Sequence, residues 1–360
     1  MAAIGFVGTG VIAWAHAIGI QAMINAGVVD ATVVAVHDLD DTRAANFAAA
    51  NGAVALPTAA DVLERCDVVW VCTPTGAHYG VVAQAVAHGR AVFCEKPLAP
   101  DLAGAKDLAA LVRGDGCPTS GVPAQVGLVL RSSPVFRALH DLVASGELGR
   151  PMTAVFRDDQ YFPIQGLYGS TWRGDVRVAG GGCLIEHSVH DLDVLRFCLG
   201  DVTEVSARTA NFAGHEGVED LAEVSLRFAS GAHAQLVSVW HDILSRRSTR
   251  RVEVFCERGL AWLDDDYLGP VHVETSAGVE VRSCRSPDWV EDLPLGRDDI
   301  GLAIRRYVEA DRAFLDAVTD GRSPDPGFAV GVAAHRLVDA AYRSAAAGGV
   351  PMALSGTAGD

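Results

Sequence analysis

The chain has 360 residues, of which 49% are apolar and 21% charged, and this length and balance favour two globular domains over a disordered protein. Its formal net charge of -16 disfavours nucleic acid and anionic membranes as partners, because like charges repel over a Debye length. Eight cysteines lie singly along the chain with no paired spacing, which is typical of buried thiols in a reducing, cytoplasmic compartment.

The first 120 residues alternate short runs rich in Val and Ala with alanine-rich segments of helical spacing. This alternation predicts βαβ units and a parallel sheet that is covered on both faces. The expected strands are 3–7, 32–37, 67–72 and 91–94. The expected helices are 14–26, 41–50, 78–88 and 101–112.

A stretch rich in Gly and Pro, residues 113–123, predicts the boundary between the domains. We therefore expect a first domain over 1–122 and a second over 123–354. Longer alternating runs in the second domain predict a mostly antiparallel sheet, at 152–160, 202–213, 218–229, 232–243, 249–256 and 270–284. Two helices are expected near 300–319 and 328–347.

Gly8, Gly10 and Ala13 form the pattern G-x-G-x-x-G/A directly after the first expected strand, where a helix begins. In such a loop the backbone N–H groups and the helix dipole meet a pyrophosphate, so Val11 and Ile12 are also candidate cofactor contacts. The alternative is a glycine-rich turn that binds nothing.

Asp38 follows the second expected strand. A carboxylate at this place accepts hydrogen bonds from the adenosine ribose hydroxyls and repels a 2′-phosphate. No arginine follows it immediately, so the sequence favours NAD over NADP. The other interpretations of Asp38 are a solvated loop acid and the N-cap of the next helix.

Three further segments occur in the order and at the spacing of a known family: Thr73–His78, Glu95–Pro97 and Gly180–Asp193. Together with Gly146–Gly149 they resemble the Gfo/Idh/MocA family of glucose–fructose oxidoreductase and inositol dehydrogenase over nearly the whole chain. The resemblance implies an N-terminal Rossmann domain, a C-terminal α/β domain with a large open sheet, and homodimers or homotetramers formed through that sheet. It implies an oxidoreductase that moves a hydride between NAD and a secondary alcohol of a sugar or cyclitol.

Glu186 and His190 are four residues apart, so on the helix expected after the glycines they share one face, with Asp193 a further turn along. A carboxylate beside an imidazole stabilises and orients the imidazolium, which makes His190 the candidate general base. The family commonly has aspartate where this chain has Glu186. Lys96, just past the fourth expected strand, is carried over as the group that hydrogen-bonds the reacting oxygen of the substrate.

The same resemblance assigns further binding residues. On the cofactor side they are Thr73, Pro74, His78 and Glu95. Around the substrate, with Lys96 and His190, they are Arg131, Tyr161, Trp172, Arg173 and His241. An aromatic plane can stack on a sugar ring and an arginine can bridge its hydroxyls. A purely structural role is an equal alternative for each of Arg131, Tyr161, Trp172, Arg173 and His241.

Four arginines crowd one short stretch: Arg246, Arg247, Arg250 and Arg251. They suit a phosphate, but a solvated hairpin whose charges pair with acids elsewhere is favoured. No metal is expected, because the chain has no HExxH motif and helical spacing separates the possible ligands Glu186, His187, His190, Asp191 and Asp193.

Two other functions stay open on the sequence. One is a redox-neutral enzyme that uses bound NAD for glycoside cleavage or epimerisation, and the other is a non-catalytic NAD-binding sugar sensor. Only a dehydrogenase leaves reduced cofactor behind, so the accumulation of NADH separates it from both.

Overall fold

The computed structural model describes residues 1–114, 121–165, 169–243, 248–266, 269–296 and 298–354. The chain divides into two compact units: unit 1 contains residues 1–129 and 287–332, and unit 2 contains residues 130–286 and 333–360. The sequence predicts two consecutive domains that meet after residue 122, whereas in the structure the chain returns to unit 1 over residues 287–332. The reason is helix α11 (Asp299–Thr319), whose Val308 and Ile304 pack against Gly19 of helix α1 (Val11–Asn25).

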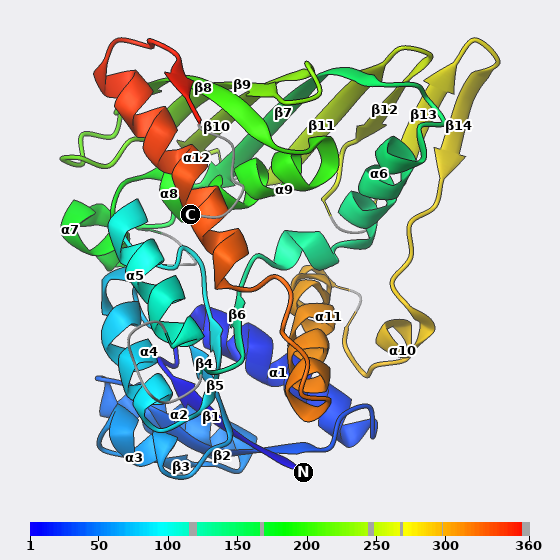
Figure 1. Ribbon diagram of the computed structural model, residues 1–360. Coiled ribbons are helices and arrows are strands. Elements are labelled where there is room, and N and C mark those ends of the chain that lie inside the picture. The colour runs from blue at the N-terminus through cyan, green and yellow to red at the C-terminus, as the bar shows by residue number, and fades with distance from the viewer. Residues whose placement is uncertain (115–120, 166–168, 244–247, 267–268, 297, 355–360) are drawn as a thin grey trace. The chain divides into compact units, whose positions relative to one another are not determined.

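Within the described residues, unit 1 contains a six-stranded parallel sheet with the order β3-β2-β1-β4-β5-β6 (Figure 1). The strands are β1 (Ala2–Val7), β2 (Ala31–His37), β3 (Val54–Ala55), β4 (Val68–Val71), β5 (Ala91–Cys94) and β6 (Ala124–Val126). Besides α1 and α11, its helices are α2 (Asp41–Asn51), α3 (Ala59–Leu63), α4 (His78–Ala87), α5 (Leu102–Arg113) and α10 (Asp288–Glu291). This confirms the expected βαβ alternation and adds β3, α3 and β6.

Helices cover both faces of this sheet, so β4 and β5 are buried along their whole length. On one face Phe6, Trp70 and Phe93 pack against α1, α2 and α11, and on the other Val69 and Val92 pack against α4 and α5. Because parallel strands end at the same edge, the loops that follow β1, β2, β4 and β5 lie at one edge of unit 1.

The described part of unit 2 contains a nine-stranded sheet with the order β14-β13-β12-β11-β7-β10-β9-β8-β15. Only β7 and β10 pair parallel among these strands, which confirms a mostly antiparallel sheet. The strands are β7 (Pro151–Tyr161), β8 (Val202–Ala210), β9 (Leu221–Phe228), β10 (His233–His241), β11 (Thr249–Cys256), β12 (Gly259–Leu263), β13 (Val271–Thr275), β14 (Gly278–Arg282) and β15 (Met352–Ala353). The helices are α6 (Pro134–Ser145), α7 (Val176–Ala179), α8 (Cys183–Glu186), α9 (Val189–Leu199) and α12 (Phe328–Ala346), which begins in unit 1.

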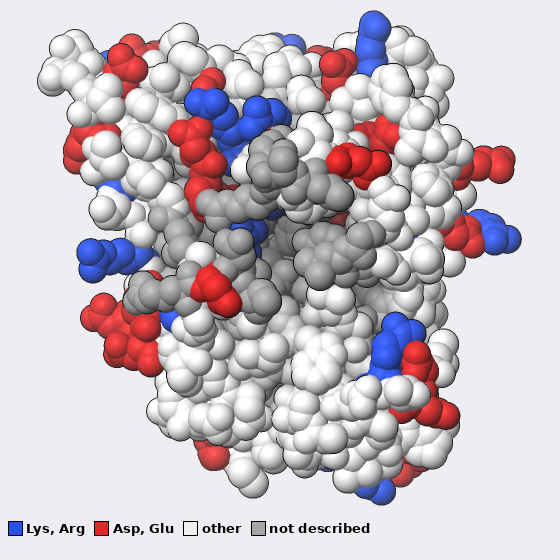
Figure 2. Space-filling view, turned by 180° about the vertical axis from the view of Figure 1, so that it is seen from behind, with Lys and Arg blue, Asp and Glu red and all other residues white. Residues whose placement is uncertain are grey.

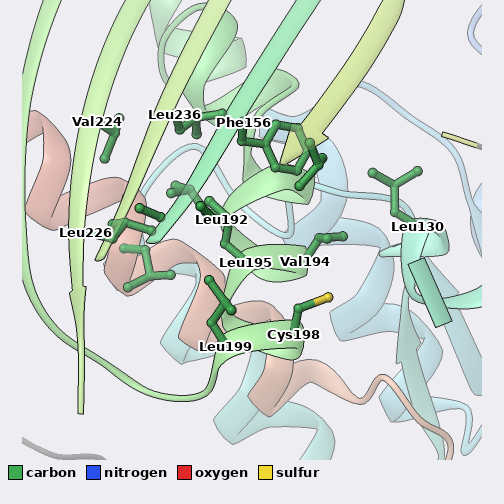
Figure 3. Close-up of a cluster of buried hydrophobic side chains, with 14 of the residues drawn as sticks. Leu130, Phe156, Leu192, Val194, Leu195, Cys198, Leu199, Val224, Leu226 and Leu236 are labelled. Atoms are coloured by element: carbon green, nitrogen blue, oxygen red, sulfur yellow. The ribbon is translucent and has the colours of Figure 1, made fainter. Parts of the chain in front are cut away.

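One face of the large sheet packs against these helices and forms the core of unit 2. Figure 3 shows Leu192, Leu195 and Leu199 of α9 facing sheet side chains that include Phe156 and Leu226. The strands alternate, so the side chains between the buried ones point to the other face. Three apolar side chains on that open face, Val155, Val237 and Phe255, are 44%, 37% and 38% exposed.

The surface carries small groups of charged side chains. On the face in Figure 2, acidic and basic side chains are scattered in such groups between wide uncharged areas. Among the described residues, no helix is both long enough and apolar enough to cross a membrane. The described cysteines are free thiols, and all except the partly exposed Cys284 are buried.

Candidate active site

The glycine-rich loop between β1 and α1 closes against the end of β4. Gly8 has a φ of 87°, and a Cβ on it would lie 2.6 Å from the carbonyl carbon and oxygen of Cys72, so only glycine fits there. Gly10 is the N-cap of α1, and a Cβ on it would meet no atom within 4 Å. The first turn of α1, with Val11 59% exposed, therefore faces open space with unsatisfied backbone N–H groups, as a pyrophosphate requires.

Asp38, directly after β2, is hydrogen-bonded to this loop. Its Oδ2 accepts hydrogen bonds from the backbone N of Thr9 at 2.7 Å and the Thr9 hydroxyl at 2.9 Å, and its Oδ1 accepts one from the backbone N of Asp40 at 2.9 Å. Partial burial raises the pKa of Asp38, but these bonds outweigh it and bring the pKa below its ordinary value. Asp40, and not Asp38, is the N-cap of α2. Asp38 is thus an ionised carboxylate beside the loop.

Four of the expected cofactor residues follow β4 and β5. The hydroxyl Oγ1 of Thr73 is buried and has no hydrogen-bond partner among the described residues, and Pro74 next to it is exposed. His78 is buried, and its Nδ1 lies 3.1 Å from the carbonyl oxygen of Leu98 and its Nε2 3.0 Å from the carbonyl oxygen of Thr73. His78 therefore supports the loop, while the Thr73 hydroxyl is an orphaned group of the kind that a ligand satisfies.

Glu95 and Lys96 come at the end of β5. Glu95 is 5% exposed, and its Oε1 lies 3.0 Å from Nε2 of His16 on α1, so this oxygen faces the interior of unit 1. Lys96 is half-buried and joined to Pro97 by a cis peptide bond. Of the two side chains, Lys96 is thus the more exposed.

The expected helix through Glu186 and His190 is interrupted, so the prediction that they share one helical face is wrong. Helix α8 ends at Glu186 and α9 begins at Val189, after a bend at His187. The Glu186 carboxylate accepts a hydrogen bond from Nε of Arg173 at 2.8 Å. The Arg173 guanidinium lies 4.4 Å from the centre of the Trp172 ring. Trp172, Arg173 and Glu186 thus form one group, and His190 is buried in the first turn of α9.

The glycines before α8 are required by close packing. A Cβ on Gly182 would lie 1.8 Å from the carbonyl oxygen of Glu219, and one on Gly181 would lie 2.2 Å from the Tyr342 hydroxyl oxygen. The carboxylate of Glu219 accepts hydrogen bonds from the backbone N of Gly182 and of Leu184, at 2.8 and 2.9 Å. Glu219 therefore closes the N-terminus of α8, a role for which the sequence carries no motif.

The other expected substrate residues fall into two groups in unit 2. Arg131 donates from Nε and Nη2 to the two carboxylate oxygens of Asp193, each at 2.7 Å. Tyr161 and His241 end the parallel strands β7 and β10, and their ring centres are 5.9 Å apart. His241 accepts from the backbone N of Ile243 at 2.9 Å and lies 3.4 Å from a carboxylate oxygen of Asp159.

Comparison with known proteins decides the family. Residues 2–121 match the model of an oxidoreductase family with an NAD-binding Rossmann fold, and residues 136–261 match the GFO/IDH/MocA C-terminal domain. The chain is 31% identical over 301 residues to 1,5-anhydro-D-fructose reductase of Ensifer adhaerens, which covers 81% of this chain and 82% of the relative. The chain belongs to the Gfo/Idh/MocA family. It is also 29% identical over 360 residues to inositol 2-dehydrogenase of Rhizobium meliloti (strain 1021), over 95% of this chain and 96% of that protein.

The fold of this Gfo/Idh/MocA chain is similar to that of a solved dehydrogenase. Levoglucosan dehydrogenase in complex with NADH and levoglucosan superposes with a TM-score of 0.84 at 21% identity, over 98% of this chain and 99% of that one. Unit 1 is the NAD-binding Rossmann fold of the family. The open N-terminus of α1, the ionised Asp38 and the orphaned Thr73 hydroxyl fit that cofactor.

In this Gfo/Idh/MocA chain the acidic residues near His190 in the sequence, Glu186, Asp191 and Asp193, each form an ion pair with an arginine. Arg250 is buried on β11 and donates to Asp191 at 2.6 Å and to Asp266 at 2.8 Å, with Asp158 at 3.6 Å. Burial raises the pKa of Asp158, and the neighbouring Asp191 raises it further, against the opposing charge of Arg250. Arg250 is thus neither on a solvated hairpin nor open to a phosphate.

The remaining members of the arginine stretch differ. Arg251 lies on the surface, where its Nε is 2.8 Å from Asp264, and Arg246 and Arg247 lie outside the described residues. In the part of the chain that the structure describes, no group of three or more His, Cys, Asp and Glu side chains is arranged to hold a metal ion.

Proposed function

We propose that this Gfo/Idh/MocA protein is an NAD-dependent dehydrogenase that moves a hydride between nicotinamide and a secondary alcohol of a sugar or cyclitol. The observation that carries the proposal is the ionised Asp38 fastened by Thr9 to the open glycine loop, at the sheet edge that also bears Lys96. Two curated relatives are named for an anhydrofructose and an inositol, which supports a sugar or cyclitol as the substrate class.

Unit 1 supplies the groups that hold the cofactor in this proposal. Gly8 to Ile12 hold the pyrophosphate, Asp38 accepts hydrogen bonds from the adenosine ribose, and Thr73 and Pro74 line the nicotinamide ribose. An ionised Asp38 repels the 2′-phosphate of NADP, so NAD is the preferred cofactor. When bound, NAD supplies the hydride acceptor.

Two side chains act on the hydroxyl group of the substrate in this proposal. His190 removes the hydroxyl proton of the alcohol, and the Lys96 ammonium donates a hydrogen bond to the same oxygen, where negative charge develops. Glu186 acts here through Arg173, which it holds against the Trp172 ring, and this pair offers a plane and hydrogen-bond donors to a sugar. Arg131, fixed by Asp193, and Tyr161 with His241 complete the proposed substrate contacts.

The open face of the nine-stranded sheet supports the homodimer or homotetramer that the family resemblance implies. Its exposed Val155, Val237 and Phe255 are apolar side chains that a second copy would cover. Sedimentation equilibrium of the purified protein measures this directly, and a monomer mass would refute it.

The test is to mix the protein with NAD or NADP and a panel of inositols, aldoses and glycosides, and to follow the absorbance of reduced nicotinamide. We expect NADH to form with at least one polyol. His190→Ala and Lys96→Ala should lower kcat by about 10²- to 10⁴-fold. The exposed His233 and Lys106 provide matched controls, since His233→Ala and Lys106→Ala should keep kcat.

Two results contradict this function. If NAD binds but no member of the panel yields NADH, the redox-neutral enzyme or the sensor is the better assignment. If neither cofactor binds, both of these alternatives fail as well.

A further inference from the structure

His16 lies in α1 below the glycine loop, and both of its ring nitrogens face carboxylates. Nδ1 is 2.6 Å from Oδ1 of Asp311 on α11, and Nε2 is 3.0 Å from Oε1 of Glu95 at the end of β5. The imidazole is completely buried. Trp70 of β4 donates from Nε1 to the same Asp311 oxygen at 3.0 Å. His16 and Asp311 together thus join α1 and α11 to β4 and to the end of β5.

The geometry sets the protonation of this histidine. A neutral imidazole has one N–H, so one of its nitrogens would present a lone pair to a carboxylate oxygen, whereas an imidazolium donates to both. Burial lowers the pKa of His16, but Asp311 and Glu95 outweigh it and raise the pKa to about 10. The other rings packed on the imidazole are Phe93 and Tyr307, with centres 5.0 and 4.9 Å away.

Glu95 has little freedom to leave this arrangement. Its backbone N donates to the carbonyl of Val71 at 3.0 Å, and Gly127 lies so close that a Cβ on it would be 2.5 Å from the Glu95 Oε1. The next residue is Lys96. The place of the Lys96 backbone is therefore set by where Glu95 is held, and Glu95 is held by His16.

We propose that His16 is a positioning residue, which clamps Glu95 to α1 and thereby fixes Lys96 at the edge where the glycine loop begins. This rests on the proposed function in one respect, the role of Lys96 toward the reacting oxygen. The clamp also ties Lys96 to α1, the helix that holds the cofactor pyrophosphate in the proposed function. If Lys96 moved by about 1 Å relative to the cofactor, the rate of the reaction would fall by about 100-fold.

The experiment uses the single variant His16→Gln and the double variant His16→Gln/Glu95→Gln. In the single variant the glutamine amide donates to Asp311 while its carbonyl faces the Glu95 carboxylate, and the cluster of Glu95, Asp311 and residue 16 gains one negative charge. In the double variant the amide of the glutamine introduced at position 95 donates to that carbonyl, Asp311 Oδ1 still accepts from Trp70, and the charge returns to the wild-type value. The stability control is Met23→Ala, because Met23 is buried on the same face of α1 and is not part of the clamp.

We expect His16→Gln to lower kcat by about 10- to 100-fold while the dissociation constant of NAD changes by less than about threefold. The double variant should recover most of kcat. Hydrogen exchange of the cofactor-free protein should become faster in the peptide spanning residues 91–98 in the single variant and return toward wild type in the double variant. Met23→Ala should leave kcat and this peptide unchanged.

The proposal is overturned if folded His16→Gln keeps both kcat and the exchange rate of the 91–98 peptide. It is also overturned if Met23→Ala lowers kcat as much at an equal loss of Tm. Failure of the proposed function gives a different result: wild type then has no turnover with any polyol, while hydrogen exchange in the cofactor-free variants still reports on the clamp.

Discussion

At the scale of single residues, Gly10 offers a test that separates binding from folding. A Cβ on Gly10 would touch no atom of the protein within 4 Å, and its φ of -71° suits any residue. Gly10→Ala should therefore fold with an unchanged Tm but bind NAD at least about tenfold more weakly, because the methyl group occupies the space of the pyrophosphate.

Gly80 is the matched control for this substitution, since it is equally open and belongs to α4 and not to the glycine loop. Gly80→Ala should keep the NAD affinity, as titration calorimetry would measure. If Gly10→Ala bound NAD like wild type, the glycine loop would not be the pyrophosphate site.

The residues that the sequence predicts best are those whose role depends on local geometry. Gly8 and Gly10 are set by a tight turn, and Asp38 by its place after a strand, so a short motif is enough to find them. His16 carries no such signal, because its partners Glu95 and Asp311 are 79 and 295 residues away. The pairing of Glu186 with His190 on one helix was a wrong prediction, because helical spacing alone does not show that α8 ends at Glu186 and that the chain turns before α9 begins at Val189.

At the scale of elements, Arg250 holds α9 to the sheet of unit 2. Its guanidinium on β11 pairs with Asp191 on α9 and with Asp266, all of them buried. Arg250→Met would leave these buried carboxylates without their counter-charge, so we expect the free energy of unfolding to fall by about 3–5 kcal/mol. Arg250→Lys should not restore it, because one ammonium does not reproduce the two directions of the guanidinium fork.

Arg177 of α7 is the control, because its ion pair with Asp175 lies on the surface of unit 2 and its side chain is 85% exposed. Arg177→Met should change the free energy of unfolding by less than about 1 kcal/mol. Urea unfolding followed by circular dichroism measures both variants. Equal losses for Arg250→Met and Arg177→Met would show that the buried pairs do not hold α9.

Most elements follow from periodicity, and the exceptions have physical reasons. The strands β1, β2, β4 and β5 and their helices lie where alternation and helical spacing predict them. The two-residue β3 and the five-residue α3 are too short for a periodic pattern. The return of α11 to unit 1 was not predictable either, because an apolar stripe fits many apolar partners, and its contacts with Gly19, Trp70 and Phe93 join residues far apart in the sequence.

At the scale of the whole molecule, the buried imidazolium of His16 makes stability depend on pH. In the unfolded chain its pKa has the ordinary value of 6.5, whereas in the folded protein burial, outweighed by Asp311 and Glu95, leaves it at about 10. The folded state thus binds a proton that the unfolded state has lost. Its contribution to stability is fully present below pH 6.5 and disappears as the pH rises through 10.

We therefore expect wild type to lose about 1.4 kcal/mol per pH unit from this group between about pH 7 and about pH 8.5, or roughly 2–4 °C of Tm per kcal/mol. Buried thiols such as Cys66 and Cys72, whose pKa burial raises, add to the loss only above their ordinary value of 9.0. The double variant His16→Gln/Glu95→Gln has no imidazole in this place, so its Tm should fall less steeply over the same range. Scanning calorimetry of both proteins in the same buffers makes the comparison, and parallel curves would mean that His16 is not an imidazolium in the folded protein.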